Sequence, residues 1–159
     1  MTEPEVILVF GRICSGKSSH KTSSYRIIVS NLVRDLVNSS SRDDLQNTMH
    51  LDNQIAQEIV GIIKALIYCA NYLDIEHKSI VVDGIRQSSI VNKVLESYPQ
   101  ATLVWLEVPT AIRKKRYESR KAKKDTQSFD IADNKPIELE CQKIYSIFNE
   151  RLQIINNND

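Results

Sequence analysis

The sequence of 159 residues lacks the features that mark several classes of protein. Its three cysteines, Cys14, Cys69 and Cys141, have neither the C-x-x-C spacing of a zinc site nor the even number of a disulfide framework. No apolar run approaches the length of a membrane-spanning helix, and the polar residues 1–5 do not resemble a signal peptide. A net charge of +1 argues against a protein that coats nucleic acid. We therefore expect a cytoplasmic protein with reduced thiols and no membrane partner.

Glycine is scarce as well, since the chain has only four. A sequence so sparing of glycine is expected to place each one for a backbone reason. Two of the four, Gly11 and Gly16, belong to one short segment. The remaining composition, 42% hydrophobic and 26% charged residues, is ordinary for a globular protein and predicts a single domain over residues 1–159.

The segment that contains both glycines follows an apolar run, residues 6–10, and reads Gly-Arg-Ile-Cys-Ser-Gly-Lys-Ser. It matches G-x-x-x-x-G-K-[ST], and the buried strand expected in front of it is the context that this pattern needs. Inward-pointing N–H groups and a helix N-terminus then form a cradle for phosphates. We call residues 11–18 the phosphate loop. The ATP-binding residues predicted here are Gly11, Arg12, Ile13, Cys14, Ser15, Gly16, Lys17, Ser18 and Ser19.

Two side chains of this loop have specific expected roles. Lys17 is expected to reach the β- and γ-phosphates of ATP as a catalytic cation, and Ser18 to hold Mg²⁺. A further candidate for the site is Asp83, the acid at the carboxyl end of the strand predicted over 79–84. An acid in this position after a strand is expected to bind the same Mg²⁺ or to act as a base.

Four apolar runs predict strands over residues 6–10, 25–29, 79–84 and 102–108. Helical patterns separate them: a short helix after the phosphate loop, one after Ser30 and Asn31, a long one from Leu51, one after Ser88 and a basic one after 110. A last helix is expected from 136 through 155, with a frayed end at 156–159. This alternation predicts a three-layer α/β P-loop NTPase fold around a mostly parallel sheet of four strands, or five.

Two segments after these strands resemble nucleoside and nucleotide kinases, including adenylate kinase, dephospho-coenzyme A kinase and phage deoxynucleotide kinases. Residues 83–87, Asp-Gly-Ile-Arg-Gln, resemble the D-G-[FI]-P-R and D-G-x-R segments of that family. The resemblance implies that Arg86 contacts the transferring or acceptor phosphate. Residues 30–34 resemble the segment whose arginine grips the acceptor monophosphate, which implies a substrate-binding role for Arg34.

A third segment resembles the lid of the same family. Arg116 and Arg120 match its R-x-x-x-R motif, which implies that both close over ATP and neutralise charge in the transition state. A spacing of four places both on one helix face. The polar, unpatterned residues 123–135 extend this region, so we expect a mobile lid around 113–135. The chain departs from the family in lacking the proline of D-G-F-P-R and a recognisable fifth strand after the lid.

The acceptor of the phosphoryl group is left open by these residues. Two arginines on the acceptor side favour a (deoxy)nucleoside monophosphate, which needs no strong base. A hydroxyl acceptor, such as dephospho-coenzyme A, a nucleoside or a hydroxymethylated base in DNA, needs a carboxylate; Asp83 is the first candidate, then Asp35 and Asp52. A third alternative is a nucleotide-binding module without turnover, although the N-K-x-D run of guanine-binding switches is missing.

Overall fold

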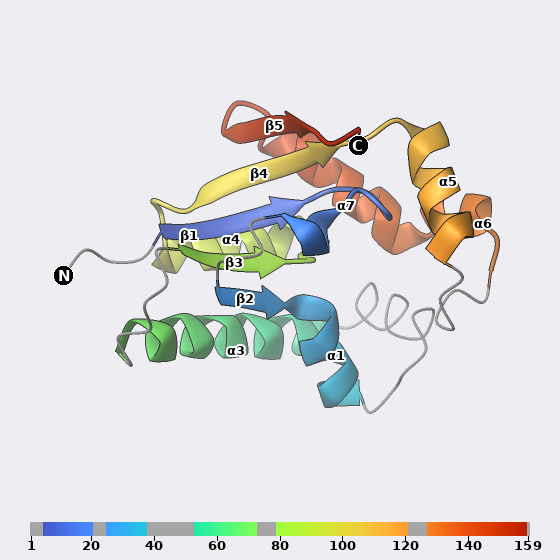
Figure 1. The fold of residues 1–159 in the computed structure, drawn as a ribbon. Coiled ribbons are helices and arrows are strands. Elements are labelled where there is room, and N and C mark those ends of the chain that lie inside the picture. The colour runs from blue at the N-terminus through green and yellow to red at the C-terminus, as the bar shows by residue number, and fades with distance from the viewer. Residues whose placement is uncertain (1–4, 21–24, 38–52, 73–78, 121–126, 159) are drawn as a thin grey trace.

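The computed structural model describes residues 5–20, 25–37, 53–72, 79–120 and 127–158 (Figure 1). Its strands are β1 Glu5–Phe10, β2 Tyr25–Ile28, β3 Ser79–Asp83, β4 Thr102–Glu107 and β5 Leu152–Asn156. Its helices are the 3₁₀ helix η1 Lys17–Ser19 and the α-helices α1 Val29–Val37, α3 Asn53–Tyr72, α4 Ser88–Ser97, α5 Thr110–Arg120, α6 Phe129–Asp133 and α7 Pro136–Ile147.

The five strands form one parallel sheet in the order β2-β3-β1-β4-β5. β1 lies at its centre, between β3 and β4, and its last five residues are buried. Parallel strands covered on both sides bury every side chain, which explains why β1, β3 and β4 are continuous apolar runs. The α/β class and the parallel sheet that the alternating pattern predicts are therefore confirmed.

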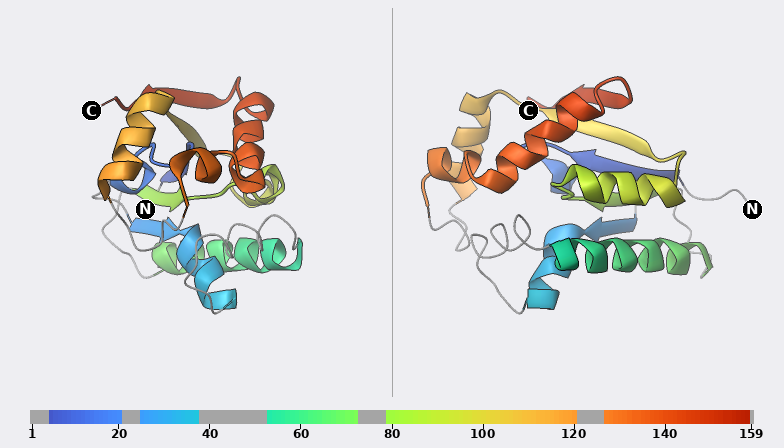
Figure 2. Two further views of the ribbon diagram at one scale, coloured as in Figure 1. Left: turned by 90° about the vertical axis from the view of Figure 1, so that its right-hand side faces the viewer. Right: turned by 180° about the vertical axis from the view of Figure 1, so that it is seen from behind.

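The main hydrophobic core joins one face of this sheet to α1, α3, α4 and α7. Figure 1 shows α4 and α7 behind the sheet and α3 below β2, and the right-hand view of Figure 2, from behind, shows α4 and α7 in front of the strands. A smaller cluster, made of strand residues alone, lies on the opposite face. The connection from β1 to β2 contains η1, so a short helix near Lys17 is confirmed, and among the described residues of this connection it is a single 3₁₀ turn.

The end of the chain differs from the sequence prediction. The expected helix through 155 ends at Ile147, and residues 152–156 form the fifth strand, parallel to β4. Ile144, Leu152 and Ile155 fit one helical stripe by spacing, but a chain reversal at 148–151 interrupts it. The frayed end predicted for 156–159 is also wrong as far as Asn157, whose N–H donates to the Glu107 carbonyl at 3.0 Å.

Two smaller boundaries differ as well. β2 ends at Ile28 and α1 begins at Val29, so Ser30 and Asn31 lie inside the helix instead of capping it. Part of the segment expected to be unpatterned forms α6, capped by the Ser128 side chain, which accepts a hydrogen bond from the Ile131 N–H. A helix of five residues is too short to show a hydrophobic period. The predicted helix start at Leu51 lies outside the described residues.

No helix among the described ranges is long and apolar enough to cross a membrane.

The packing of α7 predicts unequal costs for two substitutions on the same helix. Ile144 is 0% exposed and belongs to the main core, whereas Ile147 is 55% exposed. Ile144→Ala removes buried methyl groups and leaves a cavity, so we expect it to lower the free energy of unfolding by about 2–5 kcal/mol. Ile147→Ala should change it by about 0.5 kcal/mol or less. Urea unfolding of both variants checks this; equal losses would contradict the described packing.

Candidate functional site

The register of the sheet places the phosphate loop beside the end of β3. Val9 of β1 lies opposite Asp83 of β3, so the loop that follows β1 starts at the height where Asp83 ends its strand. The phosphate loop and the turn after β3 each contain a glycine with a left-handed backbone: Gly16 has φ +89° and Gly84 has φ +95°. Only glycine adopts such angles without strain, which accounts for two of the four glycines in the chain.

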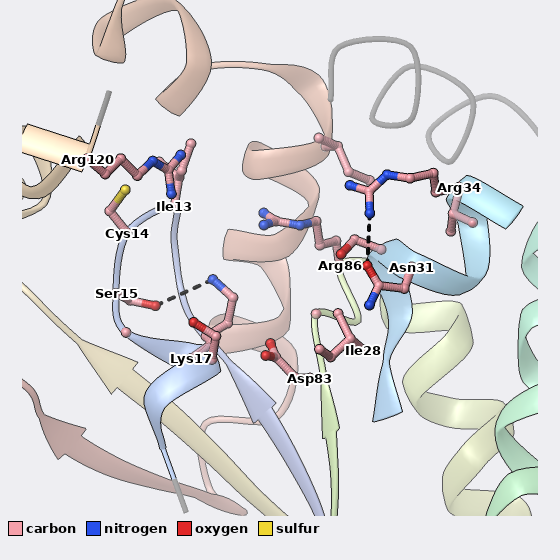
Figure 3. A pocket seen from close by; sticks show the side chains of 16 residues that line it. Ile13, Cys14, Ser15, Lys17, Ile28, Asn31, Arg34, Asp83, Arg86 and Arg120 are labelled. Atoms are coloured by element: carbon pink, nitrogen blue, oxygen red, sulfur yellow. Dashed lines mark hydrogen bonds between the residues drawn. The ribbon is translucent and has the colours of Figure 1, made fainter. Parts of the chain in front are cut away.

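A cavity of about 330 Å³ opens at this edge of the sheet (Figure 3). Its lining includes ten of the residues predicted for the site: Ile13, Cys14, Ser15, Gly16, Lys17, Ser18, Arg34, Asp83, Arg86 and Arg120. The other predicted residues, Gly11, Arg12, Ser19 and Arg116, lie around the loop without lining the cavity. Among the described residues, the lining carries four cationic side chains and one carboxylate, so the cavity favours a ligand with several negative charges.

Lys17 folds back over its own loop. Its Nζ donates hydrogen bonds to the carbonyls of Gly11, at 2.9 Å, and Arg12, at 3.1 Å. Burial, and next the charge of Arg86, lower the pKa of Lys17. A bound phosphate would offer this ammonium group the negative charge that neutral carbonyls lack.

Asp83 has a partner that the sequence patterns did not indicate. Its Oδ2 lies 3.3 Å from Nη1 of Arg26, which also donates to the Lys17 carbonyl at 3.0 Å. Arg26 lies opposite Val81 in the sheet register, on the face where η1 lies. A single arginine in a β-rich run gives no signal of this role, because its contacts with Asp83 and with the Lys17 carbonyl arise only in the fold.

The two predicted acceptor arginines occupy the same side of the cavity. Arg34 of α1 donates to Oδ1 of Asn31 at 2.9 Å. Arg86 extends into the space between Arg34 and Lys17, as Figure 3 shows, and its Nη1 donates to Oε1 of Glu138. Burial by itself lowers the pKa of Arg86. Nearby negative charges, of which Glu138 is the largest, more than offset this effect, so the pKa of Arg86 is raised.

Arg116 and Arg120, one helical turn apart on α5, do different things. Arg120 lines the cavity near Cys14 and stacks on the Tyr117 ring. Arg116 donates to the carbonyls of Cys14, at 3.2 Å, and Asn157, at 2.7 Å. In this structure Arg116 therefore supports the loop backbone, whereas Arg120 is the arginine of the pair that reaches the cavity.

Asn157, which the sequence analysis placed in a frayed end, fastens the loop from the β5 side. Its Nδ2 donates to the Ser15 carbonyl at 2.9 Å. A Cβ at Gly16 would lie 2.3 Å from the same Nδ2, so any larger residue there would displace the Asn157 amide in addition to adopting an unfavourable φ. Sequence reasoning missed Asn157 because the fifth strand that carries it there was not recognised.

A second missed feature is a buried ion-pair network that joins the loop to α5 and α6. The Asp133 carboxylate accepts from Arg113 at 2.5 Å and 3.2 Å and lies 3.1 Å from Arg12. Arg113 is buried and also lies over the Phe129 ring. Arg113 appeared in the sequence as part of a basic helix face, and its partner lies 20 residues away, in a segment without a pattern.

Comparisons with known proteins agree with this architecture. The structure is similar to those of a shikimate kinase from Bacteroides thetaiotaomicron (TM-score 0.59, 12% identity), a gluconokinase from Sinorhizobium meliloti 1021 (0.54, 16%) and a sugar kinase from Janibacter sp. HTCC2649 (0.54, 12%). The alignments cover 96%, 100% and 96% of this chain and 86%, 86% and 85% of those chains. No protein-family model and no curated protein matches the sequence. The chain therefore has the α/β fold that these three kinases share.

The buried network predicts a strong contrast between two aspartates of α6. Asp133→Asn removes the counter-charge of the buried Arg113, and we expect the free energy of unfolding to fall by about 3–5 kcal/mol. Asp130→Asn breaks the pair with Lys114, whose side chains are 72% and 46% exposed, and should cost about 0.5 kcal/mol. Denaturant unfolding measures both. A loss for Asp133→Asn as small as that for Asp130→Asn would contradict the network.

Proposed function

We propose that this protein is an ATP-dependent kinase whose acceptor is a small, phosphorylated nucleotide, a nucleoside or deoxynucleoside monophosphate. The observation that carries this proposal is the charge of the cavity. Lys17, Arg34, Arg86 and Arg120 face one carboxylate, Asp83, which is itself paired with Arg26. A triphosphate donor together with a monophosphate acceptor supplies the negative charge that such a lining attracts.

The proposed roles follow from where the side chains lie. The phosphate loop and Lys17 hold the phosphates of ATP, and Arg120 covers the donor side near Cys14. Arg34 and Arg86 hold the acceptor phosphate, one oxygen of which attacks the γ-phosphorus while the bond to the β-phosphate oxygen breaks. Because that oxygen is already ionised, positioning and charge stabilisation carry the reaction. Closure of residues 113–135 as a lid remains part of this proposal.

The residues present also fit Mg²⁺. The Ser18 hydroxyl and the Asp83 carboxylate line the same cavity, and both are the oxygen ligands that this ion prefers. The described residues contain no cluster of three or more His, Cys, Asp or Glu side chains that could hold a metal ion without help. Mg²⁺ needs only one or two protein ligands when nucleotide phosphates supply the others. The bound ion would neutralise part of the charge of those phosphates.

A hydroxyl acceptor is the second candidate. The three similar structures are a shikimate kinase, a gluconokinase and a sugar kinase, which favours an alcohol as acceptor. Asp83 would then accept the hydroxyl proton, since it is the carboxylate among the cavity-lining residues. Asp35 is exposed on α1, and Asp52 lies outside the described residues. A hydroxymethylated base in DNA belongs to this alternative.

The first test is removal of the loop lysine. Lys17→Ala should abolish phosphoryl transfer while the unfolding midpoint stays near that of the wild type, because the hydrogen bonds of Nζ go to Gly11, Arg12 and Ser15 of the loop itself. Lys143→Ala, at an exposed lysine on α7, is the matched control and should retain activity. A coupled ADP-release assay measures both. Retained turnover in Lys17→Ala would refute the donor site.

The second test separates the acceptors. ADP release should occur with at least one nucleoside monophosphate, and Arg34→Gln should raise the KM of that acceptor about 10-fold or more, the cost of a lost charge-assisted contact, with little change in the KM of ATP. Turnover with alcohols alone would favour the second candidate and contradict the first. Hydrolysis that no acceptor accelerates would favour a nucleotide-binding module.

A further inference from the structure

Glu138 is a charged residue buried beside the site that no role assigned so far explains. It is the third residue of α7, and its side chain is 0% exposed. An acid in the first turn commonly caps its own helix. Here both carboxylate oxygens contact other segments of the chain, so capping does not account for its burial.

The two oxygens connect the donor and acceptor sides of the cavity. Oε2 accepts the Ile13 backbone N–H of the phosphate loop at 3.1 Å and lies 3.6 Å from Nε of Arg12. Oε1 accepts from Nη1 of Arg86. Ile13 and Arg86 both line the cavity. One buried carboxylate therefore fixes a loop amide and the acceptor-side arginine relative to each other.

The charge of Glu138 also compensates the cations of the site. Burial lowers the pKa of Lys17 and of Arg86. Among the charges that raise these pKa values, the Glu138 carboxylate has the largest effect on both groups. The two cations themselves repel, as the lowering of the Lys17 pKa by Arg86 shows. Without the Glu138 charge, the positive potential of this part of the cavity would rise.

We propose that Glu138 is a positioning residue, an internal counter-ion that holds Arg86 and the phosphate loop in register for transfer and competes with ligand phosphates for their charge. The role of Glu138 in phosphoryl transfer rests on the proposed function. The carboxylate keeps the cations in place when no ligand neutralises them, and it moderates phosphate affinity so that a charged product can leave. Loss of its charge should therefore strengthen ground-state binding and slow transfer.

The decisive variant is Glu138→Gln, which keeps the side-chain volume and removes the charge. With the side chain in the same position, the amide NH₂ group replaces one carboxylate oxygen, so either the Ile13 N–H or Arg86 faces a donor instead of an acceptor. Isothermal titration with pyrophosphate should show binding about 5-fold tighter or more than in the wild type. The kcat of transfer should fall about 10-fold or more, because Arg86 loses its fixed orientation. A residue that merely supported the fold would weaken binding and activity together.

Two further variants make the outcome unambiguous. Glu138→Asp keeps the charge but is too short to reach both partners, so pyrophosphate affinity should stay within about twofold of the wild type while kcat falls. It carries the test if Glu138→Gln does not fold. Glu140→Gln, on the same helix and paired with Lys143 at the surface, should change neither quantity.

Pyrophosphate binding needs no acceptor, so the comparison decides about Glu138 even where kinase activity is absent. Unchanged or weaker pyrophosphate binding by folded Glu138→Gln, or full kcat in Glu138→Asp, would overturn the proposal.

Discussion

The repulsion between cations gathered at the carboxyl edge of one parallel sheet is the constraint on which the site depends. Lys17 and Arg86 lie close enough for the charge of one to lower the pKa of the other. Three buried carboxylates balance such cations: Asp83 pairs with Arg26, Asp133 pairs with Arg12 of the loop and Arg113 of α5, and Glu138 pairs with Arg12 and Arg86. Buried charges are tolerated only when they are paired in this way. The cavity itself stays strongly positive, which suits a phosphate ligand.

These carboxylates also explain how distant segments come to support one loop. Asp133 and Glu138 lie on α6 and α7, more than a hundred residues after the loop, and each contacts both the loop and a second arginine. Asn157, beyond β5, adds a neutral hydrogen bond to the same backbone. Arg116 of α5 donates to the Cys14 carbonyl, so α5, α6, α7 and the segment after β5 all contact the loop. Preorganised donors of this kind cost little to align when a ligand binds.

Sequence patterns correctly predicted the features whose signal lies within a few neighbouring residues. The apolar strands, the glycine-dependent loop, the acid that ends β3 and the arginine that follows it were recognised because each carries its signal within a few residues. The partners Arg26, Asp133, Glu138 and Asn157 carry no such signal, since each acquires its role only through tertiary contact. The fifth strand was missed because Leu152 and Ile155 also fit a helical period, and a β-rich run of five residues cannot be distinguished by periodicity alone.

The proposed function requires one cavity to hold a triphosphate and a phosphorylated acceptor on opposite sides. Thermal unfolding with a non-hydrolysable ATP analogue and Mg²⁺, with and without each nucleoside monophosphate, tests it most directly, since ligands that bind the folded state raise its apparent stability. We predict a rise in Tm with the analogue and a further rise when the correct monophosphate is added. An unchanged Tm with the analogue, or a monophosphate that binds only in its absence, would contradict the account.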